Sequence, residues 1–438
     1  MRERDGQKHS NPMLAIFSTV FLDMLGFGIL IPVYPLLISP NSPFRVTPES
    51  WSFTDGLIML GWLQGVFPLF IFLAAPILGQ LSDRHGRRPV LAFSIFGTAV
   101  GYAIFAIGIS TANIPLLFLG RALDGATGGN LAVAQAAIGD ISTNENRAKN
   151  FGLLGAAFGL GFVIGPYVGG RLSGSGKSFY GLFDTPSWFG ATTPFWFAAI
   201  LSSVNCLLIL TVLPETLKQK VTSGRVRLGQ AVSNVVAGFR SLRLRVVLGT
   251  TFFFNAGFTF FTTFFGVYLR NNFGFDEGKT GDYFALVGIF IALSQAVLVG
   301  RVARRLSDWK VLRFSCFGTA AMMFVYFFGP TSTTAFIYLT VPFFTFFNGL
   351  TIANTTSLVS RSAEPGRQGE AMGIYSSVQN LAQVPASVLV GYVTSSITSA
   401  TPLVVSGICI TVAGLLFLGF FRPTYVSESP STVTTAAH

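Results

Sequence analysis

The chain is built from long apolar runs separated by short polar segments. A membrane-spanning helix needs about 20 mostly apolar residues, and each run reaches roughly that length. The pattern over 438 residues therefore predicts an all-α membrane protein with twelve spanning helices. The predicted spans are 13–38, 56–80, 89–110, 114–139, 150–172, 192–213, 246–270, 281–302, 311–329, 334–359, 370–395 and 400–421.

One polar connection, 214–245, is much longer than the others on its side of the membrane. The segments before and after it are related at an offset of 221 positions: Gly79 matches Gly300 and Gly152 matches Gly373 at equivalent places. Duplicated halves are typical of secondary transporters with a substrate site between them. We therefore expect two pseudo-symmetric six-helix bundles, with the division 1–213 (first bundle), 214–245 (linker), 246–421 (second bundle) and 422–438 (tail).

Composition and charge exclude a soluble, nucleic-acid-binding protein. The chain is 51% hydrophobic and only 11% charged, whereas a soluble domain carries about 25% charged residues. Of the 29 Lys and Arg residues, 23 fall on the side of Gly86, five on the opposite side and one, Arg121, inside a span. Basic residues concentrate on the cytoplasmic side of membrane proteins. The net charge of +11 could indicate nucleic-acid binding, but its unequal distribution indicates a membrane protein instead. Together with twelve spans, it predicts a multi-pass protein of the cell membrane with both termini in the cytoplasm.

The residues that usually carry metal or redox chemistry are few and scattered. The three cysteines lie in apolar runs without a cysteine neighbour, and the three histidines lie outside the spans. This pattern indicates neither a disulfide framework nor a metal site. The sequence shows no recognisable set of catalytic residues, and we expect neither an enzyme nor a bound cofactor.

Three ionisable residues lie well inside predicted spans: Asp23, Arg121 and Asp124. Each costs about 2.5–3.5 kcal/mol at the membrane centre on insertion scales, so a functional role is the default interpretation. Arg121 and Asp124 are three positions apart and share one helix face. A desolvated carboxyl tends to hold its proton, and a nearby cation favours its release. We predict proton coupling at these residues; the alternative is a static ion pair that joins the first and fourth spans.

Uncharged polar side chains inside the spans are candidates for lining a cavity that binds a small-molecule substrate. Each is equally compatible with a hydrogen bond between neighbouring helices. The candidates are Gln64, Asn130, Gln135, Asn255, Gln295, Asn348, Gln379, Asn380 and Gln383. A few of the 46 phenylalanines would give such a cavity apolar walls.

The segment Gly79–Val90 (GQLSDRHGRRPV) joins the second and third spans by a short, highly charged turn. Asp83 is suited to a helix N-terminus in the other half, where the helix dipole favours negative charge. Arg87 or Arg88 is suited to pair with Asp140 at the end of the fourth span. We predict a cytoplasmic gate whose contacts hold that side shut and break on opening; the alternative is a simple topology anchor. The predicted gate residues are Gly79, Asp83, Arg87, Arg88 and Asp140.

The fifth span carries Gly161, Gly165 and Gly169 at four-residue spacing, together with Pro166. Small residues at this spacing let two helix backbones approach closely, and proline removes a helical hydrogen bond and bends the helix. One interpretation is tight packing, and the other is a sliding contact between the two halves.

Several segments together resemble the drug:proton antiporters of the major facilitator superfamily, above all the tetracycline-resistance branch and its bacterial multidrug relatives. They are Phe21–Leu37 (FLDMLGFGILIPVYPLL), Gly79–Val90, Gly120–Ser142, Phe158–Gly170 (FGLGFVIGPYVGG) and Pro194–Leu217. The resemblance implies the fold of that superfamily and the export of amphipathic or hydrophobic small molecules, driven by a proton gradient. It also implies that Asp23 and Arg121 take part in proton coupling, that Asp83 and Arg87 belong to the gate, and that the fifth span holds the antiporter motif. We expect the protein to act as a monomer in the bilayer.

The chain departs from the tetracycline exporters at three places. Ile291 stands where those proteins have a histidine, the span 311–329 lacks their acidic residue, and Asp124 replaces a common glutamine. The first two departures argue against tetracycline itself as the substrate. The third adds a second protonatable group. The alternative function is a proton symporter that imports a sugar, an organic acid or another metabolite.

Overall fold

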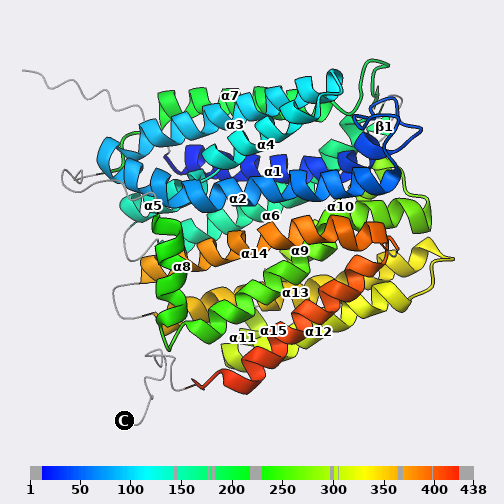
Figure 1. The fold of residues 1–438 in the computed structure, drawn as a ribbon. Coiled ribbons are helices and arrows are strands. Elements are labelled where there is room, and N and C mark those ends of the chain that lie inside the picture. Colours follow the sequence, from blue (N-terminus) through cyan, green and yellow to red (C-terminus); the bar gives the residue numbers. More distant parts are fainter. Residues whose placement is uncertain are drawn as a thin grey trace, which may run out of the picture.

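The computed structural model describes residues 12–142, 147–174, 178–179, 183–217, 229–295, 300–303, 305–363, 368–396 and 398–423. The described chain is almost entirely helical, and its long helices run side by side (Figure 1). The first half contains α1 (Pro12–Ile38), α2 (Phe53–His85), α3 (Arg87–Ser110), α4 (Ile114–Thr127), α5 (Asn130–Ile141), α6 (Arg147–Leu172) and α7 (Thr193–Val212). The second half contains α9 (Arg245–Phe273), α10 (Glu277–Leu293), α11 (Gly300–Ala303), α12 (Asp308–Phe328), α13 (Thr334–Ser362), α14 (Gln368–Ser396) and α15 (Thr401–Phe420).

Within the described residues, every predicted span is largely helical. Among the described residues, eight helices are individually long and apolar enough to cross a membrane: α1, α2, α3, α7, α9, α12, α13 and α15. The all-α membrane architecture is therefore confirmed, while the number of twelve crossings stays a prediction.

Within the described residues, one span that we expected to be continuous is interrupted. The fourth span breaks at Gly128 and Gly129 into α4 and α5, because glycine is a poor helix former. A Cβ at Gly129 would lie 2.6 Å from the Cα of Ala75 in α2, so small residues are also needed for the two helices to approach here. In the eighth span, between α10 and α11, residues 296–299 lie outside the described residues.

Two elements lie outside the predicted spans. The short helix α8 (Gln230–Arg240) forms within the predicted linker, of which residues 218–228 lie outside the described residues. The strands β1 (Ser178–Phe179) and β2 (Phe183–Asp184) pair antiparallel, a small exception to the all-helical expectation.

The connections distinguish the two ends of the protein (Figure 1). The strands lie at one end, called the hairpin end below, and α8 lies at the other, called the motif end because Gly79–Val90 turns there. Gly86 separates α2 from α3 with a φ of 110°. L side chains rarely adopt this conformation, so the turn requires glycine.

The two halves meet through α2 with α14, α6 with α10, and α1 with α9. In α2, a Cβ on Gly61 would lie 3.2 Å from the Cα of Gly391 in α14. In α10, a Cβ on Gly281 would lie 2.6 Å from the carbonyl oxygen of Pro166 in α6. Gly61 and Gly281 lie in the first third of their helices, nearest the hairpin end. The halves are therefore packed backbone to backbone at that end.

Aromatic packing fills the core of the second half. The ring of Phe261 lies 4.4 Å from that of Phe265 and 4.9 Å from that of Phe344, centroid to centroid. Other large apolar side chains, such as Phe93 and Phe314, are exposed on the outside of the bundle. An exposed apolar surface of this kind fits a membrane environment.

Candidate functional site

A buried ion pair lies on α4 in the first half. The Nη1 of Arg121 donates to Oδ2 of Asp124 over 3.0 Å, and the two residues are only 2% and 4% exposed. Their three-residue spacing places them on one helix face, as predicted. The guanidinium carbon of Arg121 lies 4.1 Å from the centre of the Phe67 ring of α2, a cation–π contact. Arg121 is thus held between a carboxylate and an aromatic face.

Arg121 keeps unused hydrogen-bonding capacity. Among the described residues, its Nε and Nη2 atoms have no hydrogen-bond partner, although both are buried. A buried donor without an acceptor costs about 1–3 kcal/mol, and more when it is charged. Such an arrangement is expensive for a purely structural ion pair and suits a site at which charge is rearranged.

Asp23 has a different partner from Arg121. Its Oδ1 accepts a hydrogen bond from Nδ2 of Asn130 over 3.0 Å. Asn130 is the first residue of α5, so the interruption at Gly128 and Gly129 places this side chain beside α1. Among the described residues, Asp23 and Arg121 share neither a hydrogen bond nor an ion pair. The three predicted ionisable residues, all in the first half, therefore form two separate polar contacts in the structure.

The Oδ1 of Asn130 is buried and has no partner among the described residues. An asparagine amide offers both a donor and an acceptor. Its NH2 group serves the carboxylate form of Asp23, and its carbonyl oxygen could accept from the protonated form after rotation of the amide. Asn130 is therefore equipped to partner Asp23 in both protonation states.

Gln64, one of the predicted cavity residues, is bonded within the first half. Its Oε1 accepts from the hydroxyl of Tyr34 over 2.5 Å, which links α2 to α1. Tyr34 and Phe67 were not among the predicted site residues. A tyrosine inside an apolar span usually finds a polar partner when buried, and that is the signal that could have singled out Tyr34.

Among the described residues, the remaining cavity candidates share no hydrogen bond with this cluster. Asn255 and Asn380 each donate to a carbonyl four residues earlier in their own helices, over 2.9 and 3.0 Å. Asn348 is fully buried, and neither of its side-chain amide atoms has a partner among the described residues. Gln295 is exposed at the end of α10, and the structure shows partial burial of Gln135, Gln379 and Gln383.

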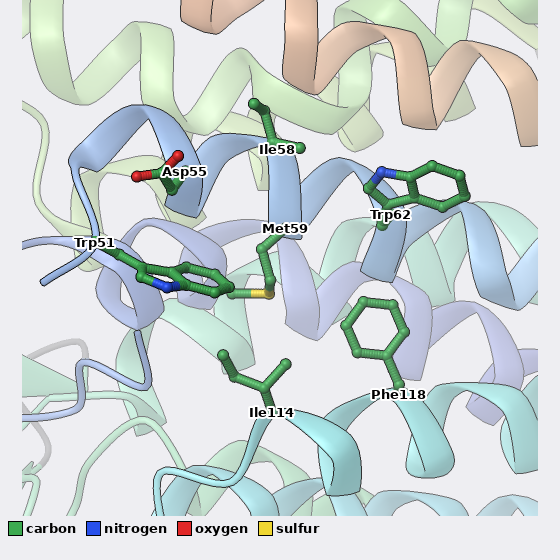
Figure 2. Close-up of a pocket in the computed structure, with 7 residues that line it drawn as sticks. All are labelled: Trp51, Asp55, Ile58, Met59, Trp62, Ile114 and Phe118. Carbon is green, nitrogen blue, oxygen red and sulfur yellow. The ribbon is translucent and has the colours of Figure 1, made fainter. Parts of the chain in front are cut away.

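An open groove of about 700 Å³ lies near the hairpin end between α2 and α4 (Figure 2). Its lining is mostly aromatic and aliphatic: Trp51, Asp55, Ile58, Met59, Trp62, Ile114 and Phe118. Trp51 and Trp62 are exposed, so the groove opens on the outside of the protein. None of the predicted cavity residues lines it.

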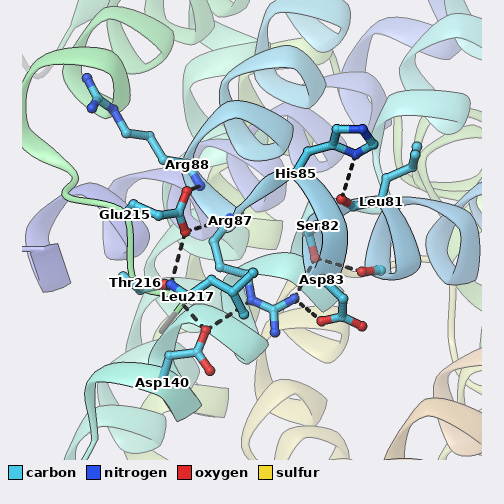
Figure 3. A network of polar contacts seen from close by, with 11 residues as sticks. Leu81, Ser82, Asp83, His85, Arg87, Arg88, Asp140, Glu215, Thr216 and Leu217 are labelled. Carbon is cyan, nitrogen blue, oxygen red and sulfur yellow. Dashed lines mark hydrogen bonds and ion pairs between the residues drawn. The ribbon is translucent and has the colours of Figure 1, made fainter. Parts of the chain in front are cut away.

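A polar network surrounds Arg87 at the motif end (Figure 3). Arg87 pairs with Asp83 (Nη1 to Oδ1, 2.6 Å) and with Asp140 (Nε to Oδ2, 3.0 Å). Its Nη1 also donates to the Ser82 hydroxyl over 2.6 Å. The predicted pairing of Arg87 with Asp140 is present. Asp83 contacts Arg87 in its own half, where we had expected a helix N-terminus of the other half.

Glu215 completes this network and was missed by the sequence analysis. Its carboxylate accepts from the backbone N–H of Arg87 over 2.8 Å, and a Cβ at Gly86 would collide with it. Arg88 donates to the carbonyl of Leu210 in α7 instead of joining Asp140. An acidic residue directly after an apolar run was the available signal for Glu215. A Cβ at Gly79 would meet no atom within 4 Å, so close packing does not require glycine at this position.

The glycines of the fifth span pack against α1 in the same half. A Cβ on Gly161, Gly165 or Gly169 would lie 2.5–2.6 Å from a carbonyl oxygen of α1. Pro166 contacts both halves: a Cβ on Gly28 of α1 would lie 2.5 Å from its ring Cδ, and a Cβ on Gly281 of α10 would lie 2.6 Å from its carbonyl oxygen. The structure therefore shows tight packing of this motif on α1, while a sliding contact between the two halves stays a prediction.

An ion pair also crosses that boundary at the hairpin end. The Nη2 of Arg171 in α6 donates to both carboxylate oxygens of Asp282 in α10, over 2.8 Å each. The two residues are 111 positions apart, and no local pattern in the sequence indicated that they would meet.

Comparison with known proteins agrees with this architecture. The profile of the Major Facilitator Superfamily matches residues 16–387. The class C tetracycline resistance protein of Escherichia coli is 29% identical over 412 residues, which cover 94% of this chain and 96% of that protein. A crystal structure of the human organic anion transporter MFSD10 aligns with a TM-score of 0.69 at 21% identity, over 93% of this chain and 98% of that chain. The D-xylose-proton symporter aligns with a TM-score of 0.74 at 17% identity, over 94% and 98%.

Proposed function

The chain belongs to the major facilitator superfamily, and from that premise we propose that it is a proton-coupled antiporter that exports amphipathic or hydrophobic small molecules. Members of this superfamily are membrane transporters, not enzymes. The observation that carries the proposal is a pair of polar contacts in the first half: Arg121 with Asp124, which is buried, and Asp23 with Asn130, which is partly buried. The extensive similarity to a tetracycline resistance protein supports the direction of transport.

Asp23 is the proposed proton carrier. As a carboxylate it accepts from the Asn130 amide, and protonation removes a charge that the apolar bundle disfavours. The Arg121–Asp124 pair provides a second acidic group and a fixed cation, so a proton bound by either acid changes the net charge of the cluster. An inward proton moving down 100 mV supplies about 2.3 kcal/mol per charge, which can drive uphill export without ATP or a cofactor.

The motif end is the proposed cytoplasmic end, because most of the basic residues lie on the side of Gly86. The hairpin end then faces outward, and we propose that the close packing of Gly61 and Gly281 across the boundary is part of the outer gate. In the proposed cycle, the contacts at the hairpin end separate while the Arg87 network forms part of the closed gate at the motif end. The two proposed bundles are 1–213 and 246–421, acting within one monomer.

We propose export of an apolar molecule over import of a sugar because the chain is similar over most of its length to a tetracycline resistance protein. The likeness to the D-xylose-proton symporter is at 17% identity and shows the fold alone. A proton symporter remains the second candidate, and the direction of proton movement separates the two.

The test uses purified protein in liposomes with an imposed pH gradient and an apolar fluorescent cation as a probe. We expect probe movement opposite to the proton, and loss of uphill transport in Asp23→Asn with probe exchange at equilibrium retained. Asp184→Asn, which removes an exposed acid of β2, is the matched control and should transport normally. Full uphill transport by Asp23→Asn would remove Asp23 as the carrier, and probe movement together with the proton would establish symport.

A further inference from the structure

The helix α8 (Gln230–Arg240) differs from the other helices in its direction. Figure 1 shows it crossing the ends of the long helices at the motif end. It packs against α2 of the first half and against α9 and α14 of the second half. Since the long helices cross the membrane, a helix across their ends lies along the membrane surface.

The rotation of α8 about its axis is fixed by tight packing on one face. Ala231 is 1% exposed. A Cβ on Gly238 would lie 2.5 Å from Cγ2 of Ile374 in α14 and 2.6 Å from Cδ1 of Leu248 in α9. The other faces of α8 are therefore presented in a defined direction.

Beside this packed face, α8 exposes an apolar stripe. Val232, Val236 and Phe239 are 56%, 43% and 40% exposed. Their spacing of four and three residues places them on one side of the helix. Apolar side chains that face water forgo the free energy of burial, so this stripe is suited to an apolar environment. Leu242, in the connection between α8 and α9, is also exposed.

Basic side chains lie next to the stripe. Arg240, Arg243 and Arg245 follow it within six residues and are all exposed. An amphipathic helix with an apolar face and flanking cations is typical of segments that lie in the membrane interface. Basic residues beside a membrane attract acidic lipid headgroups.

We propose that α8 inserts its apolar stripe, Val232, Val236 and Phe239, into the membrane interface at the motif end, and that Arg240 and Arg243 bind the headgroups of acidic phospholipids. Charge complementarity identifies the occupant as a lipid surface of negative charge. Because α8 contacts both halves, lipid bound to α8 would lie at the boundary between them. The inference rests on the membrane location of the protein and not on proton coupling or on the substrate.

The experiment places an environment-sensitive fluorophore on the full-length protein in proteoliposomes. Cys206, Cys316 and Cys409 are first replaced by serine, and a single cysteine is introduced by Val236→Cys for labelling with a nitrobenzoxadiazole dye. Ala237→Cys is the matched control, because Ala237 is the adjacent exposed residue and points away from the stripe by one helical step. A thermal unfolding midpoint equal to that of the unlabelled protein shows that each labelled protein is folded.

We expect blue-shifted emission at position 236 and stronger quenching by lipids spin-labelled near the headgroup than at position 237. Equal quenching at the two positions, or none at 236, would overturn the insertion. Spin-labelled phosphatidylglycerol should quench the dye at 236 more than spin-labelled phosphatidylcholine does. The double variant Arg240→Gln/Arg243→Gln should lose this preference, by about fivefold per arginine. An unchanged preference in that variant would overturn the assignment of the headgroup site.

Discussion

Removal of the Arg171–Asp282 ion pair is expected to shift the protein toward a conformation that is open at the hairpin end. The pair joins α6 to α10 across the boundary between the halves, with Nη2 at 2.8 Å from both carboxylate oxygens. It has to break if the halves separate there. Its contribution to closure can therefore be measured as a change in the ratio of closed to open protein.

The free energy that the ion pair contributes to closure can be worked out from its geometry and its exposure. Hydrogen bonds to charged groups contribute about 1.5–3 kcal/mol when they are well shielded. The side chains of Arg171 and Asp282 are 19% and 39% exposed, so solvent screening reduces this toward the value of exposed pairs, at most about 1 kcal/mol. A change of about 1 kcal/mol alters a population ratio roughly fivefold.

The assay is a distance distribution between two spin labels at the hairpin end, one on each half. Thr111, directly after α3, and Ser332, between α12 and α13, are both exposed and suit this purpose. Arg171→Gln and Asp282→Asn should each raise the population with long distances about fivefold relative to the short one. The charge reversal Arg171→Asp combined with Asp282→Arg should restore the original ratio.

The matched control is Arg270→Gln. Arg270 pairs with Glu277 over 3.0 Å at the same end, but both residues belong to the second half. This variant should leave the distance distribution unchanged. Equal effects of Arg171→Gln and Arg270→Gln would refute the reasoning, because the response would then come from loss of charge and not from the boundary between the halves.

Three further predictions concern packing, the motif end and the proposed proton site. Gly165→Leu should destabilise the protein by about 1–3 kcal/mol, because its side chain would meet an α1 carbonyl; Gly159→Leu, where no atom lies within 4 Å, should show no comparable drop in the thermal unfolding midpoint. Arg87→Gln should lower the free energy of unfolding by about 2 kcal/mol, because two carboxylates lose their partner. A drop in the thermal unfolding midpoint no larger than that of Arg88→Gln would contradict this. Asn130→Leu should slow proton-driven transport about tenfold by removing a hydrogen bond to a charged group, and unchanged transport would show that Asn130 does not support Asp23.

Much of the architecture was predictable from the sequence, because a chain in lipid must satisfy its backbone hydrogen bonds within each span. The length of each apolar run is therefore sufficient to predict a helix, and within the described residues every predicted span is largely helical. Local spacing was also sufficient for the Arg121–Asp124 pair, since residues three apart share a helix face. The pairing of Arg87 with Asp140 was predictable because both lie at the same end of neighbouring spans.

Only the tertiary structure decided which side chains from distant segments meet. The separation of Arg171 from Asp282, of Tyr34 from Gln64 and of Asp23 from Asn130 ranges from 30 to 111 residues. Periodicity places a side chain on a helix face, but the neighbour of that face is set by how the helices pack and cross. The apolar runs thus determined that helices form, and their packing determined which polar groups share a buried environment.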